Sequence, residues 1–274
     1  MPRKVFLITR WKTAVTCVLM AMLLAPAFSH DTWLSVRRAS VAVGADVTLD
    51  LTSGMTFPLL AYPINVERIE QAGYRLGGKT TELTERHAST RSLRLTTRFT
   101  APGIAVLWVQ LKPKVLELTP SKVAEYLDEI GASPEIHQAW AQAKPRRWRE
   151  VYAKHAKTFV RVGASAQDQS WAESVGLGLE IVPEKDPTQL QAGDEFPVRV
   201  LRHGQPFANF PLGIIREKAA HGVIQKTDAE GRTVFKLHQA GQWLVRGTDL
   251  RKSSVPNTDW ESDFTTLTIA VHTR

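Results

Sequence analysis

The stretch LGLEIVPEKDPTQLQAGDEFPVRVL, residues 177–201, carries the pattern that decides the fold. Two short apolar runs, LGLEIV and EFPVRVL, are separated by a connection rich in proline, glycine and charged residues. Runs of this kind between turn-forming residues are typical of β-strands. The pattern continues to the C-terminus in PLGIIRE, GVIQKT, RTVFKL, QWLVRGT and FTTLTIAV. About seven short strands at near-regular spacing predict an immunoglobulin-like β-sandwich over residues 176–274.

The residues before this sandwich also have a β texture. Runs of alternating or continuous apolar character occur between residue 30 and about residue 112, and glycines separate them. These runs are TWLSVR, DVTLDL, SLRLTTRF and IAVLWVQL. We therefore expect a first β domain over residues 30–175. The predicted fold class is mainly β, with two β-sandwich domains in tandem.

A helical pattern interrupts the β texture at residues 119 to about 157. In TPSKVAEYLDEIGA, Thr119 is a candidate N-cap, Pro120 suits the first helical position, and Gly131 suits the helix end. PEIHQAWAQA and PRRWREVYAKHAKTF, which follow, also read as helices. The sequence therefore predicts a helical insertion in or after the first β domain.

Residues 1–29 have the three parts of a secretory signal peptide. Basic residues precede an apolar run at residues 13–25, and the small residues Ala27 and Ser29 follow it. The apolar run is shorter than the roughly 20 residues needed to span a bilayer. We expect cleavage after Ser29 or after Ala27, a periplasmic or secreted protein, and no membrane span once the signal is removed.

The net charge and the cysteine content limit which partners and which metal ligands the protein can have. The whole chain has a formal charge of +8, but residues 1–29 hold four of the 35 basic residues and none of the 27 acidic ones. The remainder has 31 basic against 27 acidic residues, a net charge of +4 without a basic stripe, so nucleic acid is not an indicated partner. Cys17 is the only cysteine and lies in the predicted signal. A metal site would therefore use histidine, carboxylate, backbone or amine groups, with methionine as the one soft alternative.

His30 is the first candidate metal ligand. Cleavage after Ser29 would make it the first residue, and its α-amine and imidazole could then chelate one metal ion. A third nitrogen would complete a site that suits Cu(II) or Ni(II). Cleavage after Ala27 would instead make His30 the third residue, which also allows a terminal copper or nickel site through backbone amides.

His155 is the candidate for the second imidazole. Trp148, Tyr152, His155 and Phe159 are spaced by 4, 3 and 4 positions, which places them on one face if this segment is a helix. The alternative is a core histidine bonded to backbone or to Tyr152. Asp31 and Tyr152 are candidates to orient an imidazole N–H from outside the metal site, and Asp31 could equally be an ordinary strand residue.

Motifs for catalysis are missing from the sequence. It contains no GxSxG elbow and no HExxH zinc motif, and no cysteine follows residue 17. GLGLE lacks the helix that a nucleotide-binding loop would precede. The sequence therefore favours a protein that is not an enzyme.

Several segments together resemble a known family. They are HDTWL, YAKHAKTFVRVG, LEIVPEKDP with GDEFPVRVL, TDAEGRTVFKL with AGQWLVRG, and DWESDFTTLTI. In these segments the chain resembles the secreted bacterial family called domain of unknown function 4198, which has been grouped with nickel-uptake (NikM-like) periplasmic proteins. The resemblance implies an exported protein with β-sandwich domains that is linked to uptake of transition-metal ions. HDTWL and KHAK include His30 and His155, so the resemblance adds weight to that pair.

Three functions follow from these observations. The first is a periplasmic protein that binds Cu or Ni, or Co, through His30 and His155 and assists an envelope metal-uptake transporter. The second is a structural or interaction module of an envelope transport system without metal. The third is a copper-dependent oxidative enzyme acting on polysaccharide, for which exposed aromatic residues would be needed. The chain has numerous tryptophans, but the sequence pattern indicates that several of them are buried; they include Trp33, Trp108, Trp140, Trp148 and Trp171.

Overall fold

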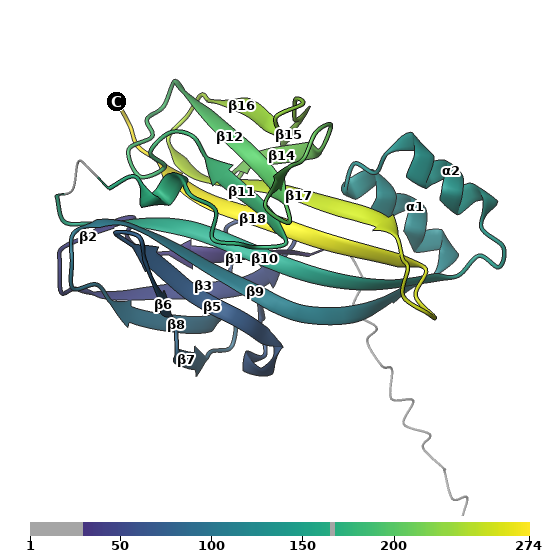
Figure 1. The fold of residues 1–274 in the computed structure, drawn as a ribbon, viewed down its shortest axis with the longest axis horizontal. Coiled ribbons are helices and arrows are strands. Elements are labelled where there is room, and N and C mark those ends of the chain that lie inside the picture. The colour runs from purple at the N-terminus through teal and green to yellow at the C-terminus, as the bar shows by residue number, and fades with distance from the viewer. Residues whose placement is uncertain (1–29, 165–167) are drawn as a thin grey trace, which may run out of the picture.

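The computed structural model describes residues 30–164 and 168–274 (Figure 1). The predicted signal peptide, residues 1–29, lies outside the described residues. The described chain forms three β-sheets and two α-helices, with short 3-10 turns at Val66–Arg68 and Ser170–Ala172. None of the helices in this part of the chain is long and apolar enough to cross a membrane.

A nine-stranded sheet forms the middle layer of the molecule. Its strands, in spatial order, are β15 (Val223–Lys226), β14 (Pro211–Arg216), β17 (Gly241–Lys252), β18 (Trp260–Val271), β10 (Trp148–Val162), β9 (Gly103–Leu118), β5 (Ile69–Leu76) and β6 (Lys79–Glu82), and β2 (Ser40–Val41) pairs with β10. β10 and β18 run parallel, with Glu150 opposite Trp260 and Thr158 opposite Thr268. Through this pair, strands from the two halves of the chain join in one sheet.

A smaller sheet covers each face of the middle layer (Figure 1). The first contains β1 (Asp31–Val36), β3 (Asp46–Gly54), β8 (Leu93–Arg98), β7 (Glu85–Ala88) and β4 (Tyr62–Pro63). The second contains β11 (Leu179–Pro183), β12 (Asp194–Arg202), β13 (Gln205–Pro206) and β16 (Arg232–Leu237). Successive side chains of a strand point to opposite faces. Accordingly, Val160 of β10 lies in the core under the first sheet, and the adjacent Phe159 lies in the core under the second.

The mainly β fold class is confirmed. The strands expected after residue 176 are present and form two packed sheets around one core, as in an immunoglobulin-like sandwich. The two sandwiches differ from a simple tandem because they share the middle sheet. That sheet takes β5, β6, β9 and β10 from before residue 175 and β14, β15, β17 and β18 from after it.

Two of the three predicted helices are present. α1 (Pro120–Glu129) begins after the N-cap Thr119, and Gly131 follows its end in a left-handed conformation, with φ of 64°. α2 (Pro134–Gln142) follows directly. α1 and α2 together form a helical hairpin. This hairpin lies at one end of the long strands β10, β17 and β18 (Figure 1).

The helix predicted over PRRWREVYAKHAKTF is wrong, because residues 148–162 form strand β10. The helical part of the insertion therefore ends at residue 142, well short of residue 157. β10 lies between β9 and β18 and is largely buried on both faces. A strand of this kind does not show the apolar and polar alternation by which strands are recognised.

Candidate functional site

His30 lies directly before β1 and is half-buried. Its ring packs against Tyr62, with ring centroids 5.1 Å apart. The backbone carbonyl of His30 accepts a hydrogen bond from Nζ of Lys154. Burial lowers the pKa of His30, and the positive charge of Lys154 lowers it further. A neutral imidazole is the form that binds a metal ion.

Asp31 is engaged away from the His30 imidazole. Its carboxylate forms an ion pair with the guanidinium of Arg246 from β17. Asp31 raises the pKa of Arg246 through this pair. A small cavity of about 90 Å³ lies beside the pair and is lined also by Glu129 and Pro211. Asp31 therefore fixes the start of β1 to the middle sheet.

Lys154 and Tyr152 contact each other on the same side of β10 as His30. The ammonium of Lys154 lies 5.6 Å from the ring centroid of Tyr152 and 5.2 Å from that of Phe264. Burial, as the largest cause, lowers the pKa of Lys154 to about 8. Arg68 lies on the Tyr152 ring as well, at 5.7 Å. Tyr152 is thus placed beside cations and does not orient His155.

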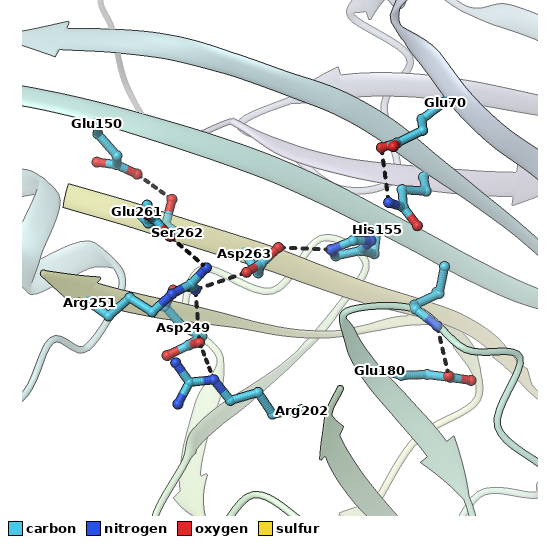
Figure 2. Close-up of polar contacts among 12 residues, drawn as sticks. Glu70, Glu150, His155, Glu180, Arg202, Asp249, Arg251, Glu261, Ser262 and Asp263 are labelled. Atoms are coloured by element: carbon cyan, nitrogen blue, oxygen red, sulfur yellow. Dashed lines mark hydrogen bonds and ion pairs between the residues drawn. The ribbon is translucent and has the colours of Figure 1, made fainter. Parts of the chain in front are cut away.

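His155 is almost fully buried, with 2% of its surface exposed. Its Nε2 lies 3.1 Å from Oδ1 of Asp263 on β18 (Figure 2). A Cβ added at Gly178 would lie 3.7 Å from Nε2, so the ring packs closely on that backbone. The other ring nitrogen, Nδ1, is buried without a hydrogen-bond partner among the described residues. A histidine–carboxylate pair is present, but no nucleophile is bonded to it in this part of the chain.

Asp263 connects His155 to a network of charges on β17 and β18. Arg251 donates to Asp263 at 2.8 Å and to Asp249 at 3.0 Å, and Asp249 is also 3.0 Å from Arg202 on β12 (Figure 2). Burial would raise the pKa of Asp263, but His155 and Arg251 outweigh that effect and lower it. Burial raises the pKa of Asp249. The network therefore ties the second small sheet to the middle sheet.

The structure does not bring His30 and His155 together. Lys154 and His155 are consecutive residues of β10, and consecutive side chains of a strand point to opposite faces. Lys154 reaches His30, whereas His155 faces Gly178 and Asp263. Within residues 30–164 and 168–274, no group of three histidine, cysteine or acidic side chains is arranged to hold a metal ion. The two-histidine ligand set does not fit this geometry.

The tryptophans considered as a glycan-binding face are all buried. Their exposed fractions are at most 9%. They are Trp33, Trp108, Trp140, Trp148 and Trp171. They cannot form a flat exposed platform for a polysaccharide, so the oxidative-enzyme hypothesis loses the feature on which it depended.

Sequence reasoning missed the partners of both histidines. Lys154 contacts His30 across sheets, and Asp263 contacts His155 from a strand more than a hundred residues away in the chain. One signal was present in the sequence. Charged residues alternate with other residues on the two segments that become β17 and β18, at Asp249, Arg251, Glu261 and Asp263. Opposite charges at alternate positions of paired strands indicate a cross-strand ion network.

Replacing Asp263 with asparagine is expected to lower the free energy of unfolding at neutral pH by about 1–3 kcal/mol, since His155 and Arg251 both lose a charged partner. The folded-state pKa of Asp263 is lowered, so its contribution is present above the unfolded pKa of about 4 and is lost as the pH falls through the folded pKa. The free energies of unfolding of the parent and of Asp263→Asn, measured with urea, should therefore become equal in acid. The exposed Glu195, changed to glutamine, is the control; equal loss in both variants would contradict the assignment.

A comparison with known protein families identifies the family of this chain. The family described as domain of unknown function (DUF4198) matches residues 27–248. The chain belongs to this family. No curated protein matches the chain.

Two solved structures match the chain with low scores. The structure of titin domains A168–A170 is 7% identical, with a TM-score of 0.23, and the match covers 89% of this chain and 68% of that chain. The structure of an ICAM-5 D1–D4 ectodomain fragment is 12% identical, with a TM-score of 0.22, and the match covers 88% of this chain and 51% of that chain. TM-scores this low carry no conclusion about either fold or function.

Proposed function

We propose that this member of the DUF4198 family binds a transition-metal ion through His30 in the periplasm and passes it to an envelope metal-uptake transporter. Cu or Ni is the expected metal, with Co as a third candidate. The observation that supports the proposal is the state of His30. Its imidazole is half-buried with a lowered pKa, and no hydrogen bond to it is found among the described residues.

The ligand set differs from the one expected from sequence. Cleavage after Ser29 would free the α-amine of His30, which together with the imidazole forms a bidentate chelate. Lys154 donates a hydrogen bond to the backbone carbonyl of His30, and the next residue, Asp31, is paired with Arg246. These two contacts give His30, which would carry both the amine and the imidazole nitrogen, a defined position. His155 takes no part, because it is buried on the other face of β10 with Asp263 as its partner.

Metal titration of three proteins tests this proposal. Intact mass of the exported protein first establishes whether the chain begins at His30. His30→Ala is expected to lose most of the affinity for Cu(II) and Ni(II), since it removes one of the two nitrogens of the chelate. His155→Ala is the matched control and is expected to bind within about twofold of the parent, because it lies on the opposite face.

The same experiment can refute the proposal. If His30→Ala binds as tightly as the parent, His30 is not the ligand. If His155→Ala loses the affinity while His30→Ala keeps it, the site lies in the Asp263 network on the opposite face.

A further inference from the structure

A hollow lies on the outer face of the first small sheet. Leu49 of β3 and Leu95 of β8 are fully buried in the core between this sheet and the middle layer. Successive side chains of a strand point to opposite faces, so the residues next to these leucines face outward. The hollow has a volume of about 300 Å³ and is lined by Arg37, Thr48, His87, Arg94 and Thr96. None of the five side chains is acidic, and each carries a hydrogen-bond donor.

The strand register brings these residues together from separate parts of the chain. Thr48 of β3 is opposite Thr96 of β8, and Arg94 of β8 is opposite His87 of β7. Arg37 follows directly after the end of β1. Residues directly opposite each other in antiparallel strands have Cβ atoms about 4.5–5.5 Å apart. Three strands and the turn after β1 therefore place their polar side chains around one hollow.

Two acidic residues adjoin the hollow, and both are engaged. Asp50 is 5% exposed, accepts a hydrogen bond from the hydroxyl of Ser92 at 2.5 Å, and has Oδ1 3.5 Å from Nε of Arg94. Glu85 accepts a hydrogen bond from the hydroxyl of Thr96 at 2.7 Å. Asp50 thus orients Arg94 from below, and Glu85 uses the one hydroxyl proton of Thr96.

The remaining donors of the hollow have no partner in the part of the chain that the structure describes. No side-chain hydrogen bond or ion pair is found there for Arg37, Thr48 or His87. Arg94 is 47% exposed, and its only such contact there is the one from Nε to Asp50. The donors left for a ligand are those of Arg37, Thr48 and His87 and the terminal amino groups of Arg94.

We propose that this hollow binds the phosphate group of a small phosphorylated ligand. A guanidinium presents two parallel N–H groups that match two oxygens of an oxyanion. One such group already satisfies the two oxygens of a carboxylate, whereas donors that converge from four residues suit a tetrahedral anion with more oxygens. The volume is at the lower end of that of ligand pockets, which favours a small ligand. The proposal is independent of metal binding at His30.

The test is the binding of inorganic phosphate and of glycerol 3-phosphate, measured by calorimetry at constant ionic strength. Arg37→Gln is expected to weaken the binding of both at least about tenfold, since it removes charge-assisted hydrogen bonds. Arg37 has no partner to lose in the described chain, so the variant should fold as the parent does. Arg38→Gln is the matched control. Arg38 is exposed and does not line the hollow, and its loss should change the affinity by no more than about twofold.

Further ligands separate phosphate binding from general attraction of anions. Acetate is expected to bind more weakly than phosphate. Vesicles of phosphatidylglycerol, compared with vesicles of phosphatidylcholine, test a lipid headgroup as the source of the phosphate. Binding only to the phosphatidylglycerol vesicles, and its loss in Arg37→Gln, would support the same chemistry with a lipid as the source. Absence of binding to every phosphate probe, or equal affinities of Arg37→Gln and Arg38→Gln, would overturn the proposal.

Discussion

Replacing Lys157 with methionine is expected to lower the free energy of unfolding by about 3–5 kcal/mol. Nζ of Lys157 lies 2.7 Å from Oε1 of Glu180, and the two side chains are 2% and 0% exposed. Burial alone would raise the pKa of Glu180, but Lys157 and several hydrogen bonds outweigh that effect and lower it. The carboxylate therefore stays charged at neutral pH, and losing Lys157 leaves that charge buried without its cation.

The variants that accompany Lys157→Met separate charge from packing. Glu180 also accepts hydrogen bonds from Oγ of Ser174 and from the backbone N–H groups of residues 175–177. Combining Lys157→Met with Glu180→Gln removes the buried charge, so urea unfolding should show a smaller loss than for Lys157→Met alone. Lys236→Met, on an exposed position of β16, is the control. A loss of under about 1 kcal/mol for Lys157→Met would mean that the pair behaves like a surface ion pair.

The outer strands could be predicted from the sequence, whereas the shared middle sheet could not. Turn residues such as Gly193 and Gly231 separate segments in which apolar and polar residues alternate. This local pattern predicts strands, and the structure has strands at these positions. The pairing of β10 with β18 is parallel and joins Glu150 to Trp260. No local pattern encodes a contact across more than a hundred residues, so the sequence indicated two sandwiches and not the sheet that they have in common.

β10 shows how a buried strand can imitate a helix. The spacing of Trp148, Tyr152, His155 and Phe159 matches one helical face, yet a register shift between Tyr152 and Lys154 changes which residues face which core. The segment also contains buried polar residues, among them Glu150, so it lacks the continuous apolar run that is typical of a central strand. The secondary structure was therefore decided by tertiary pairing with β9 and β18.

Only part of the candidate site could be predicted from the sequence. His30 was found because its position after an apolar run and small residues has a chemical meaning of its own. Its pairing with His155 depended on a helix that does not exist. On β10, Lys154 contacts His30, whereas the adjacent His155 points to the opposite face and contacts Asp263.

Replacing Trp148 with alanine is expected to cost about 3–5 kcal/mol of unfolding free energy. The ring is 1% exposed and stacks on Trp260, with centroids 4.7 Å apart and planes at 17°. It also meets Tyr126 and Trp140 edge-on, at 5.7 and 5.6 Å, and these two residues come from α1 and α2. Trp148 is thus one of the residues through which the helical hairpin packs on the middle sheet.

Hydrogen exchange can locate this loss within the molecule. In Trp148→Ala, the amides of α1 and α2 should lose more protection than those of β12, because the core under the second small sheet lies on the opposite face of the middle sheet. Trp148→Phe is the matched variant. It keeps an aromatic ring but removes the N–H that donates to Glu150 at 2.8 Å, and should cost about 1–3 kcal/mol. Equal loss of protection in the helices and in β12 would show that the hairpin does not unfold separately from the sandwich, contrary to the role assigned to Trp148.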